Sequence, residues 1–177
     1  MNIILQTPRL ILRQFEPTEA NLLLDLNSDE AIVKYVHEPT LKTLDEAAYI
    51  LENIILPQYQ LGLGRWACFT KDENVFIGWC GLKYIREKDE IDLGYRFKQI
   101  FWGNGYATET AQAVLKYGFE TLQLNKIVGR AHIENLASIR VLEKIGLVYS
   151  GEAIIDDCPV KCFYLDNRAK SKEMLKK

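Results

Sequence analysis

The sequence has 177 residues, of which 48% are apolar and 26% are charged, a balance typical of a folded globular protein. Its formal net charge of −2 gives no reason to expect a general nucleic-acid-binding protein. A chain of this length buries roughly two thirds of its unfolded surface, so it needs no disulfide or metal to hold it together. We expect a single domain over residues 1–167 and a basic tail over residues 168–177.

Membrane, secretory and metal-binding classes are not indicated. The apolar runs fall far short of the roughly 20 residues that span a bilayer. The N-terminus lacks the basic start, long apolar run and cleavage site of a signal peptide. Of the four cysteines only Cys158 and Cys162 lie close together, with no histidine nearby. This spacing predicts reduced thiols, no metal site and a cytoplasmic location.

The first part of the chain predicts a strand followed by two helices. The strand is expected at residues 9–15, and Thr18 is in position to cap the first helix. The segment Thr43-Leu44-Asp45-Glu46 has the pattern of a capping box, in which the threonine hydroxyl and the glutamate each satisfy a backbone amide. The apolar residues after it have helical spacing, and Pro57 is expected to end that second helix.

The middle of the chain predicts three strands and a long helix. Residues 65–70 and 75–82 read as a hairpin, and residues 90–97 as a third strand with alternating polarity. Between residues 107 and 122 the apolar residues form one clean helical face.

The last part predicts a strand, a helix and two further strands. The strand is expected at residues 126–133, and the helix begins at Asn135 and ends at Gly146. The final strands are expected at residues 147–155 and 160–165. The resulting order, β-α-α-β-β-β-α-β-α-β-β, predicts an α+β fold with a mixed sheet, antiparallel at first and with a parallel crossover around the long helix.

The turn from Trp102 to Thr108 (W-G-N-G-Y-A-T) leads into the long helix and favours an anion site. A helix N-terminus exposes unpaired amides and a partial positive charge, so it binds phosphate when the backbone can come close. Gly103 and Gly105 remove the side chains that would block this approach, and Ala107 keeps the first turn clear. The turn lacks the Lys-Ser/Thr of a P-loop. The alternative is a tight turn that binds nothing.

A second segment of interest runs from Asn135 to Leu147. Asn135 is a good helix N-cap, which accounts for it without a ligand. Ser138 lies one turn further on, where its hydroxyl either bonds back to the cap or faces a cleft.

These segments carry a resemblance to a known family. W-G-N-G-Y-A resembles the R/Q-x-x-G-x-G/A pyrophosphate loop of the GNAT acyl-CoA N-acetyltransferases, and N-L-A-S-I-R-V-L-E-K-I-G-L resembles that family's following helix. T-P-R-L-I-L-R, F-I-G-W-C-G-L and E-I-D-L-G-Y are similar to the branch of the Rim-type ribosomal-protein alanine N-acetyltransferases. The resemblance covers about residues 6–165 and implies a GNAT-like three-layer fold with a mixed, mostly antiparallel sheet flanked by helices.

The sequence departs from the family pattern at three positions. Trp102 stands where arginine or glutamine is usual. Leu142 occupies the place of the tyrosine that many relatives use as general acid, so that role is vacant here. Leu147 replaces a phenylalanine, which is a packing change.

The resemblance implies that acetyl-CoA is a co-substrate and that its acetyl group passes directly to an amine. The amides of the turn would hold the pyrophosphate, and the edge of the preceding strand would hold the pantetheine. The residues implied in cofactor binding are Tyr95, Arg96, Phe97, Trp102, Gly103, Asn104, Gly105, Tyr106, Ala107, Thr108, Asn135 and Lys144.

Two residues are candidates for proton transfer. Asp92 matches a recurrent acidic position of the Rim-like branch and is the first candidate for the general base, the alternative being an exposed strand residue. Ser138 is the candidate donor of a proton to the leaving thiolate, or else only a helix hydrogen bond. No cysteine is placed as a nucleophile. The rival bases are Asp156, Asp157, Glu38 and His37.

The acceptor implied by the resemblance is a protein N-terminal amine. A polyamine, an amino sugar or an amino acid is an alternative acceptor, and a non-catalytic CoA-binding module is an alternative function. Trp66 and Trp79 either line an amine cleft or pack in the core. Neither nucleic acid nor a membrane is an expected partner, and a homodimer follows from the resemblance alone.

Overall fold

The structure, a computed structural model, describes residues 2–36 and 38–167, so His37 and the expected basic tail at 168–177 lie outside the described residues. Eight strands form one sheet in the order β1-β2-β3-β4-β5-β6-β8-β7. The strands are β1 (Ile3–Gln6), β2 (Leu10–Arg13), β3 (Gly64–Thr70), β4 (Phe76–Ile85), β5 (Glu90–Phe97), β6 (Lys126–His132), β7 (Val148–Ile155) and β8 (Cys158–Asp166). The α-helices are α1 (Ala20–Asn27), α2 (Glu30–Val33), α3 (Leu44–Ile50), α4 (Tyr106–Glu120) and α5 (Leu136–Lys144).

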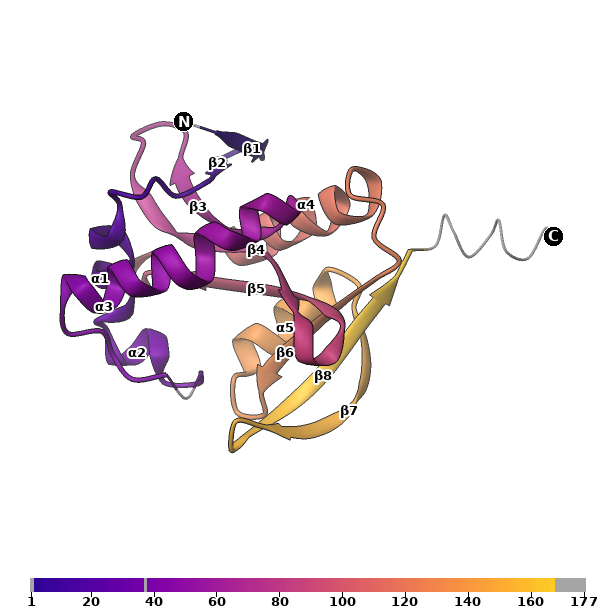
Figure 1. Cartoon of the computed structure of the whole chain (residues 1–177). Helices are drawn as coiled ribbons and strands as arrows, with labels where there is room; N and C mark the ends of the chain where they lie inside the picture. The colour runs from indigo at the N-terminus through magenta and orange to yellow at the C-terminus, as the bar shows by residue number, and fades with distance from the viewer. Residues whose placement is uncertain (1, 37, 168–177) are drawn as a thin grey trace.

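The helices cover both faces of the sheet, and this gives three layers (Figure 1). On one face, residues of α1 and α3 such as Leu23 and Ala47 pack with Trp79 of β4 in one apolar cluster. On the other face, residues of α4 and α5 such as Val114 and Leu142 pack with neighbouring strand residues in a second cluster. The predicted α+β class and three-layer architecture are therefore confirmed.

Strand directions agree with the expected mixed sheet. Every neighbouring pair is antiparallel except β5 with β6, which are parallel and are joined through α4. A parallel pair needs a long crossover connection, and the long helix supplies it. The predicted crossover is thus confirmed.

The N-terminal strand prediction was incomplete. Two strands are present, because the chain reverses at Thr7 and Pro8 and pairs β1 with β2. The Thr7 hydroxyl accepts the Leu10 N–H at 3.0 Å, and the Thr7 N–H donates to the Leu10 carbonyl at 2.9 Å. A side-chain turn of this kind needs no glycine, so the usual hairpin signal is missing from the sequence.

Two helix boundaries also differ from the prediction. Helix α1 begins after Glu19 and not at Thr18, and among the described residues no side chain caps it. Helix α3 does begin at the predicted capping box of Thr43 and Glu46. Pro57 does not end the helical path, which continues as a π-helical turn at Leu51–Ile55 and a 3-10 helix at Leu56–Leu61. Proline is tolerated there because it stands in the first turn of the 3-10 helix, where its missing N–H is not needed.

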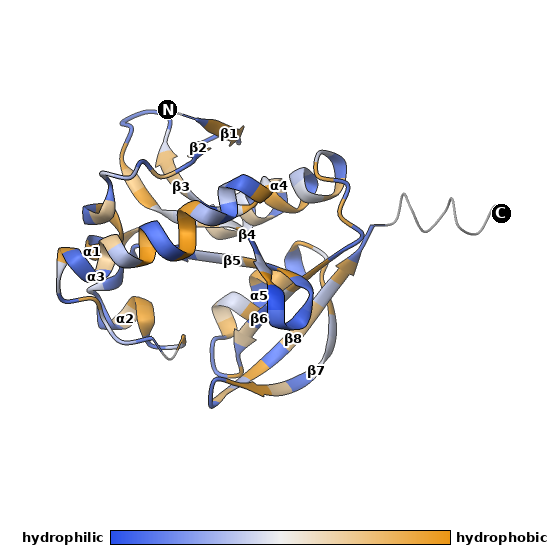
Figure 2. Ribbon diagram, in the orientation of Figure 1, coloured by the Kyte–Doolittle hydropathy of each residue, from blue (hydrophilic) through white to orange (hydrophobic). Residues whose placement is uncertain are grey.

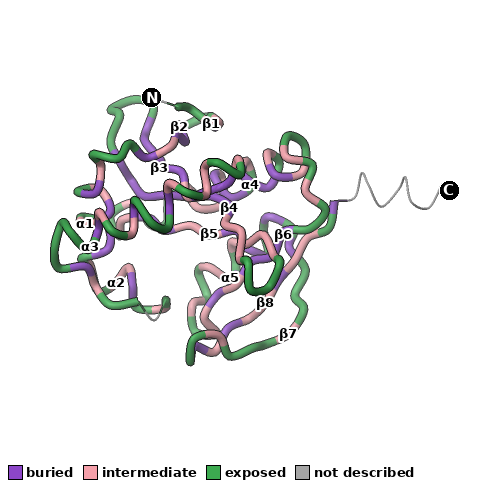
Figure 3. The backbone as a smooth tube through the Cα atoms, in the orientation of Figure 1, coloured by how far each residue is buried: buried purple, intermediate pink, exposed green. Residues whose placement is uncertain are grey.

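Hydropathy and burial follow the layers. Apolar and polar residues alternate around α3 (Figure 2), as expected of a helix with one buried face. Burial is concentrated in β3 and β4, whereas β7 is largely exposed (Figure 3). Trp66 and Trp79 are both buried, which agrees with the core-packing interpretation of these residues.

A buried ion pair fixes the chain between β2 and α1. Arg13 donates to both carboxylate oxygens of Glu19, at 2.6 and 2.8 Å, and its guanidinium lies over the Phe69 ring. Burial alone would raise the pKa of Glu19, but hydrogen bonds from Arg13 and from the Glu16 N–H outweigh it and leave this pKa below its usual value. The pair thus holds α1 against the sheet while the carboxylate is ionised.

We expect Glu19→Gln to lower the free energy of unfolding by about 2 kcal/mol at pH 7, because it leaves the Arg13 charge buried without a counter-charge. Urea unfolding measures the change, and Glu52→Gln on the exposed surface is the control. Because folding lowers the Glu19 pKa, its contribution is present at neutral pH and is lost as the pH falls through the folded pKa. The difference between wild type and variant should disappear in acid, and a constant difference would contradict this account.

Candidate active site

The sheet opens between its two parallel strands. β5 and β6 pair only at Asp92 with Val128 and at Leu93 with Gly129, although both strands continue beyond these residues. From Gly94 onward, β5 stays paired to β4 on its other side, and β6 stays paired to β8. The β5 edge facing β6 therefore carries no ladder partner over residues 94–97 in the described chain, and an extended ligand can add to it.

Two helices begin at this opening. α4 starts after the end of β5, and α5 starts after the end of β6. Because β5 and β6 are parallel, both helix N-termini lie at the same end of the strand pair. Each N-terminus carries a partial positive charge, so the opening is suited to an anionic ligand.

The predicted phosphate turn has the backbone that such a ligand needs. Gly103 and Gly105 have φ of 79° and 81°, in the left-handed region that glycine adopts without strain. Gly105 is the N-cap of α4, and among the described residues no side chain caps this helix. The first intrahelical bond is that from the Glu109 N–H to the Gly105 carbonyl, so the amides of Tyr106, Ala107 and Thr108 are free of helix partners.

An N-terminal arginine that sequence reasoning missed supports this turn. Arg9 donates to Glu109 of α4 at 2.7 Å and to the Asn104 carbonyl at 3.0 Å, and its guanidinium lies 4.3 Å from the Tyr106 ring centroid. Glu109 also accepts the Thr7 hydroxyl at 2.6 Å. The β1–β2 turn therefore holds the turn before α4 in place.

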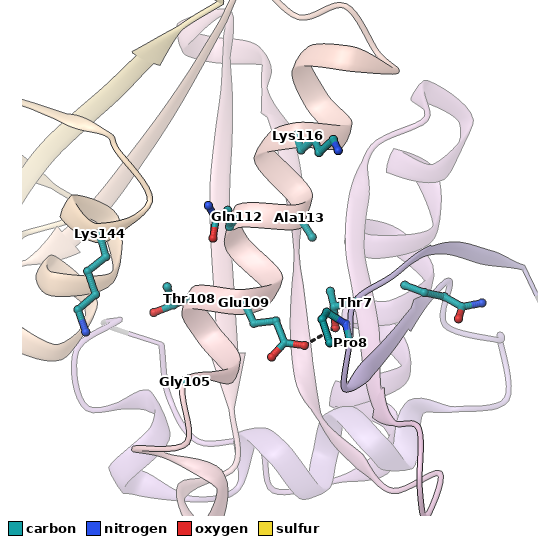
Figure 4. Close-up of a pocket in the computed structure, with 10 residues that line it drawn as sticks. Thr7, Pro8, Gly105, Thr108, Glu109, Gln112, Ala113, Lys116 and Lys144 are labelled. Atoms are coloured by element: carbon teal, nitrogen blue, oxygen red, sulfur yellow. Dashed lines mark hydrogen bonds between the residues drawn. The ribbon is translucent and has the colours of Figure 1, made fainter.

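A groove runs along the outer side of α4 (Figure 4). Its volume is about 780 Å³, and Gly105 and Thr108 from the start of α4 line it. Lys144, one of the implied cofactor residues, reaches the same groove from α5, and Lys116 adds a second cation. The structure thus brings Gly105, Thr108 and Lys144 together.

Asn135, Ser138 and Tyr95 lie where β5 faces α5. Asn135 caps α5 by accepting the Ser138 N–H at 3.1 Å, as predicted. Tyr95 donates its hydroxyl to the Ser138 carbonyl at 3.1 Å and so links the two sides of the opening. Burial raises the pKa of Tyr95, which keeps it a donor at neutral pH. Ser138 is half-buried, and its side chain hydrogen-bonds to Tyr95.

Trp102 and its neighbours are tied back to β5. The Trp102 indole N–H donates to the Phe97 carbonyl at 2.8 Å, although half of the side chain is exposed. The Asn104 amide donates to the carbonyls of Phe101 and Trp102. These side-chain hydrogen bonds to the backbone stiffen the turn. Trp102 makes its bond from the position at which the family pattern has arginine or glutamine.

Asp92 lies at the short contact between β5 and β6, next to the point where the two strands separate. Its carboxylate accepts a hydrogen bond from Arg130 of β6 at 2.7 Å, and the same guanidinium also pairs with Glu90. Burial raises the pKa of Asp92 to about 6, and it outweighs Arg130, Arg65 and Lys83, which act in the opposite direction. Asp92 is therefore not the exposed strand residue of the alternative interpretation, and it titrates near neutrality.

Arg96 faces away from the expected pantetheine edge. Its guanidinium pairs with Glu38 at 3.0 Å and hydrogen-bonds to Asn27, on the sheet face that α1 covers. Only its backbone is thus available to a ligand on the β5 edge. The same ion pair occupies Glu38, one of the rival bases.

The remaining rival bases gain no support. Asp156 and Asp157 form the exposed turn between β7 and β8, with φ of 50° and 59°. Two successive left-handed residues are what a tight hairpin turn requires, so the turn accounts for both residues. His37 lies outside the described residues.

Three kinds of feature are absent from residues 2–36 and 38–167. No group of three or more potential metal-ligating side chains occurs there, and all four cysteines are free. Within the same residues no helix is long and apolar enough to cross a membrane.

Comparisons with known proteins identify the family. Residues 9–148 match the model of the GNAT acetyltransferase domain. The chain is 30% identical over 148 residues to the uncharacterized N-acetyltransferase p20 of Bacillus licheniformis, and this covers 83% of each protein. The chain belongs to the GNAT acetyltransferase family, and it is an N-acetyltransferase whose co-substrate is acetyl-CoA.

Two solved structures share the fold. RimL, a ribosomal L7/L12 alpha-N-protein acetyltransferase in complex with coenzyme A, superposes with a TM-score of 0.81 at 16% identity and covers 93% of this chain and 98% of its own. The spermidine N-acetyltransferase of Vibrio cholerae, in complex with CoA and spermine, superposes with a TM-score of 0.74 at 22% identity and covers 89% of this chain and 95% of its own.

The described residues fit acetyl-CoA. The uncapped start of α4 offers amides to a pyrophosphate, the free β5 edge offers backbone groups to a peptide-like chain, and Lys144 offers a cation in the adjoining groove. When bound, acetyl-CoA supplies an activated acetyl group and a thiol leaving group.

We expect Gly105→Val to weaken binding of coenzyme A by at least about tenfold, because a side chain there strains the left-handed backbone and turns the first amides of α4 away. Gly146→Val is the matched control, since Gly146 also has a positive φ and open space around its Cα. Both variants should lose about 1–3 kcal/mol of stability, and only Gly105→Val should lose affinity in titration calorimetry. Equal affinities in two folded variants would contradict the assignment of this turn.

Proposed function

We propose that this protein transfers acetyl from acetyl-CoA directly to the primary amine of a protein N-terminus, with Asp92 as general base and Ser138 as proton donor. The observation that carries the proposal is the opening between β5 and β6. Around it lie an uncapped helix start, a free strand edge and a carboxylate of raised pKa. Direct transfer requires these elements and no covalent nucleophile.

Asp92 is suited to take a proton from the attacking amine. An ammonium group is not a nucleophile, and an α-amine of pKa near 8 is mostly protonated at neutral pH. A carboxylate of pKa about 6 is a better base than an ordinary aspartate and is still ionised at pH 7. Arg130 fixes its position through the bond at 2.7 Å.

Ser138 is suited to protonate the leaving thiolate. It lies in the first turn of α5, where the helix N-terminus favours developing negative charge. Its N–H bonds to Asn135, and its carbonyl and side chain bond to Tyr95, so the residue is held in place beside the opening. It takes the role left vacant at Leu142.

Charge on the sheet face next to Asp92 favours a protein N-terminus over a polyamine. Arg65 and Arg96 both lie against Trp79, with guanidinium carbons 4.7 and 5.7 Å from its ring centroid. The amine of a polycation would be repelled there, whereas a peptide with one amine is accommodated. RimL and the spermidine N-acetyltransferase both share this fold, so the choice of acceptor is argued from the charge of this sheet face.

The proposal is tested first by thermal unfolding and then by transfer. Acetyl-CoA and CoA, but not ATP, should raise the melting temperature, since a ligand at a hundred times its dissociation constant adds about 2.7 kcal/mol. Thiol release should then be faster with short peptides bearing free N-termini than with spermine. No thermal shift at millimolar acetyl-CoA would remove the cofactor assignment, and preference for spermine would overturn the acceptor.

We expect kcat, measured with both substrates saturating, to rise with pH through about 6, because only ionised Asp92 accepts the proton. Asp92→Asn should lower kcat by about 10²-fold or more and remove this rise, the acid limb of the pH profile. Ser138→Ala should lower kcat while the limb stays in place. A limb that persists in Asp92→Asn would show that another group is the base.

A further inference from the structure

One arginine in the candidate acceptor region has no counter-charge. Four arginines on the described strands are at least partly buried, and three of them have a carboxylate partner. Arg13 pairs with Glu19, Arg96 with Glu38, and Arg130 with Asp92 and Glu90. The fourth, Arg65, makes no ion pair or side-chain hydrogen bond within residues 2–36 and 38–167.

Arg65 is held in position by an indole. It stands on β3, opposite Gly81 of β4, which in turn is opposite Gly94 of β5. The missing side chain at Gly94 leaves room for the Trp79 ring, whose carbons come within 3.3 Å of where a Cβ would be. The Arg65 guanidinium lies over this ring, 4.7 Å from its centroid. Stacking of this kind orients the planar guanidinium but leaves its N–H groups unused.

The candidate base lies on the same face of the sheet. Side chains alternate between the two faces along a strand, so one face of β5 carries Asp92, Gly94 and Arg96. Gly94 is in register with Arg65 through Gly81 of β4. Adjacent strands lie about 4.8 Å apart, so the Arg65 and Gly94 Cα atoms are about 10 Å apart. A ligand of a few bonds' length spans the distance from the guanidinium to an amine beside Asp92.

We propose that Arg65 binds a carboxylate of the acceptor, so that the preferred acceptor is a peptide with an acidic side chain next to its N-terminal residue. The inference rests on the proposed function and narrows its substrate class. A stacked, half-buried guanidinium with unused donors matches a carboxylate in charge and in planar geometry. Arg96 cannot take this role, because Glu38 and Asn27 already occupy its guanidinium.

The local charge agrees with this assignment. Arg65 is influenced by Glu38, Arg96 and Asp92, and burial lowers its pKa. Since Glu38 pairs with Arg96, and Arg130 binds Asp92, Arg65 is the arginine on this face whose charge lacks a bonded partner in the described chain; the cation of Lys83, opposite Asp92 on β4, also lacks one. An acceptor carboxylate supplies that partner on binding.

The test compares two peptides that share one N-terminal residue and differ in having Glu or Gln at the second position. We expect wild type to favour the Glu peptide by at least about tenfold in kcat/KM. Arg65→Gln should abolish the preference by raising KM for the Glu peptide while kcat for both peptides is kept. Arg65→Lys should restore part of it. Arg86→Gln, which removes a charge from the exposed β4–β5 turn, should leave the preference as in wild type.

The outcomes separate this inference from the proposed function. If wild type acetylates both peptides equally, or Arg65→Gln lowers both equally, the carboxylate site is wrong and the protein N-terminal acceptor stands. If neither peptide reacts, glycine and glycinamide replace them as a second pair. Arg65-dependent preference for glycine would then support the carboxylate site and overturn the protein acceptor. Failure of all four amines would overturn both.

Discussion

The organisation of the molecule depends on the parallel strands β5 and β6, which are paired at only two positions. β5 and β6 share the pairs Asp92 with Val128 and Leu93 with Gly129, and then separate. Arg130 binds Asp92 and Glu90 across this short contact, so one guanidinium joins the strands at the point where they part. The free strand edge, the two helix starts and the carboxylate of raised pKa all follow from that geometry.

The two faces of the sheet carry different groups, which suit different substrates. α4 and α5 contribute amides, Lys144 and Ser138 on one side, and these suit a phosphorylated carrier and its thiol. Arg65, Arg96 and Trp79 lie on the other side, where α1 and α3 pack. The reaction requires two substrates to meet, and a strand with one substrate at its edge and the other over its face allows this without a covalent intermediate.

Local signals were enough to predict most of the fold and part of the site. The turn at Gly103 and Gly105, the cap at Asn135 and the capping box at Thr43 are written in residues at most a few positions apart, so the sequence shows them. The Thr7 turn was missed because its signal is a threonine hydroxyl, not a glycine. The contacts of Arg9 with Glu109 and of Arg130 with Asp92 depend on strand order and register, which no short pattern encodes. Arg65 stood out only when the partners of the other arginines were known.

The hydrogen bonds between the β1–β2 turn and α4 have a consequence for the folding process. Thr7 and Arg9 meet Glu109 across 102 and 100 residues of chain, which makes these contacts among the most non-local in the molecule. Closing so long a loop is entropically unfavourable and comes late in folding when local contacts are available first. The hairpins and α4 can form early, but the turn before α4 reaches its final shape only when the beginning of the chain docks. We expect the ability to bind coenzyme A to appear among the last properties acquired by the folding protein.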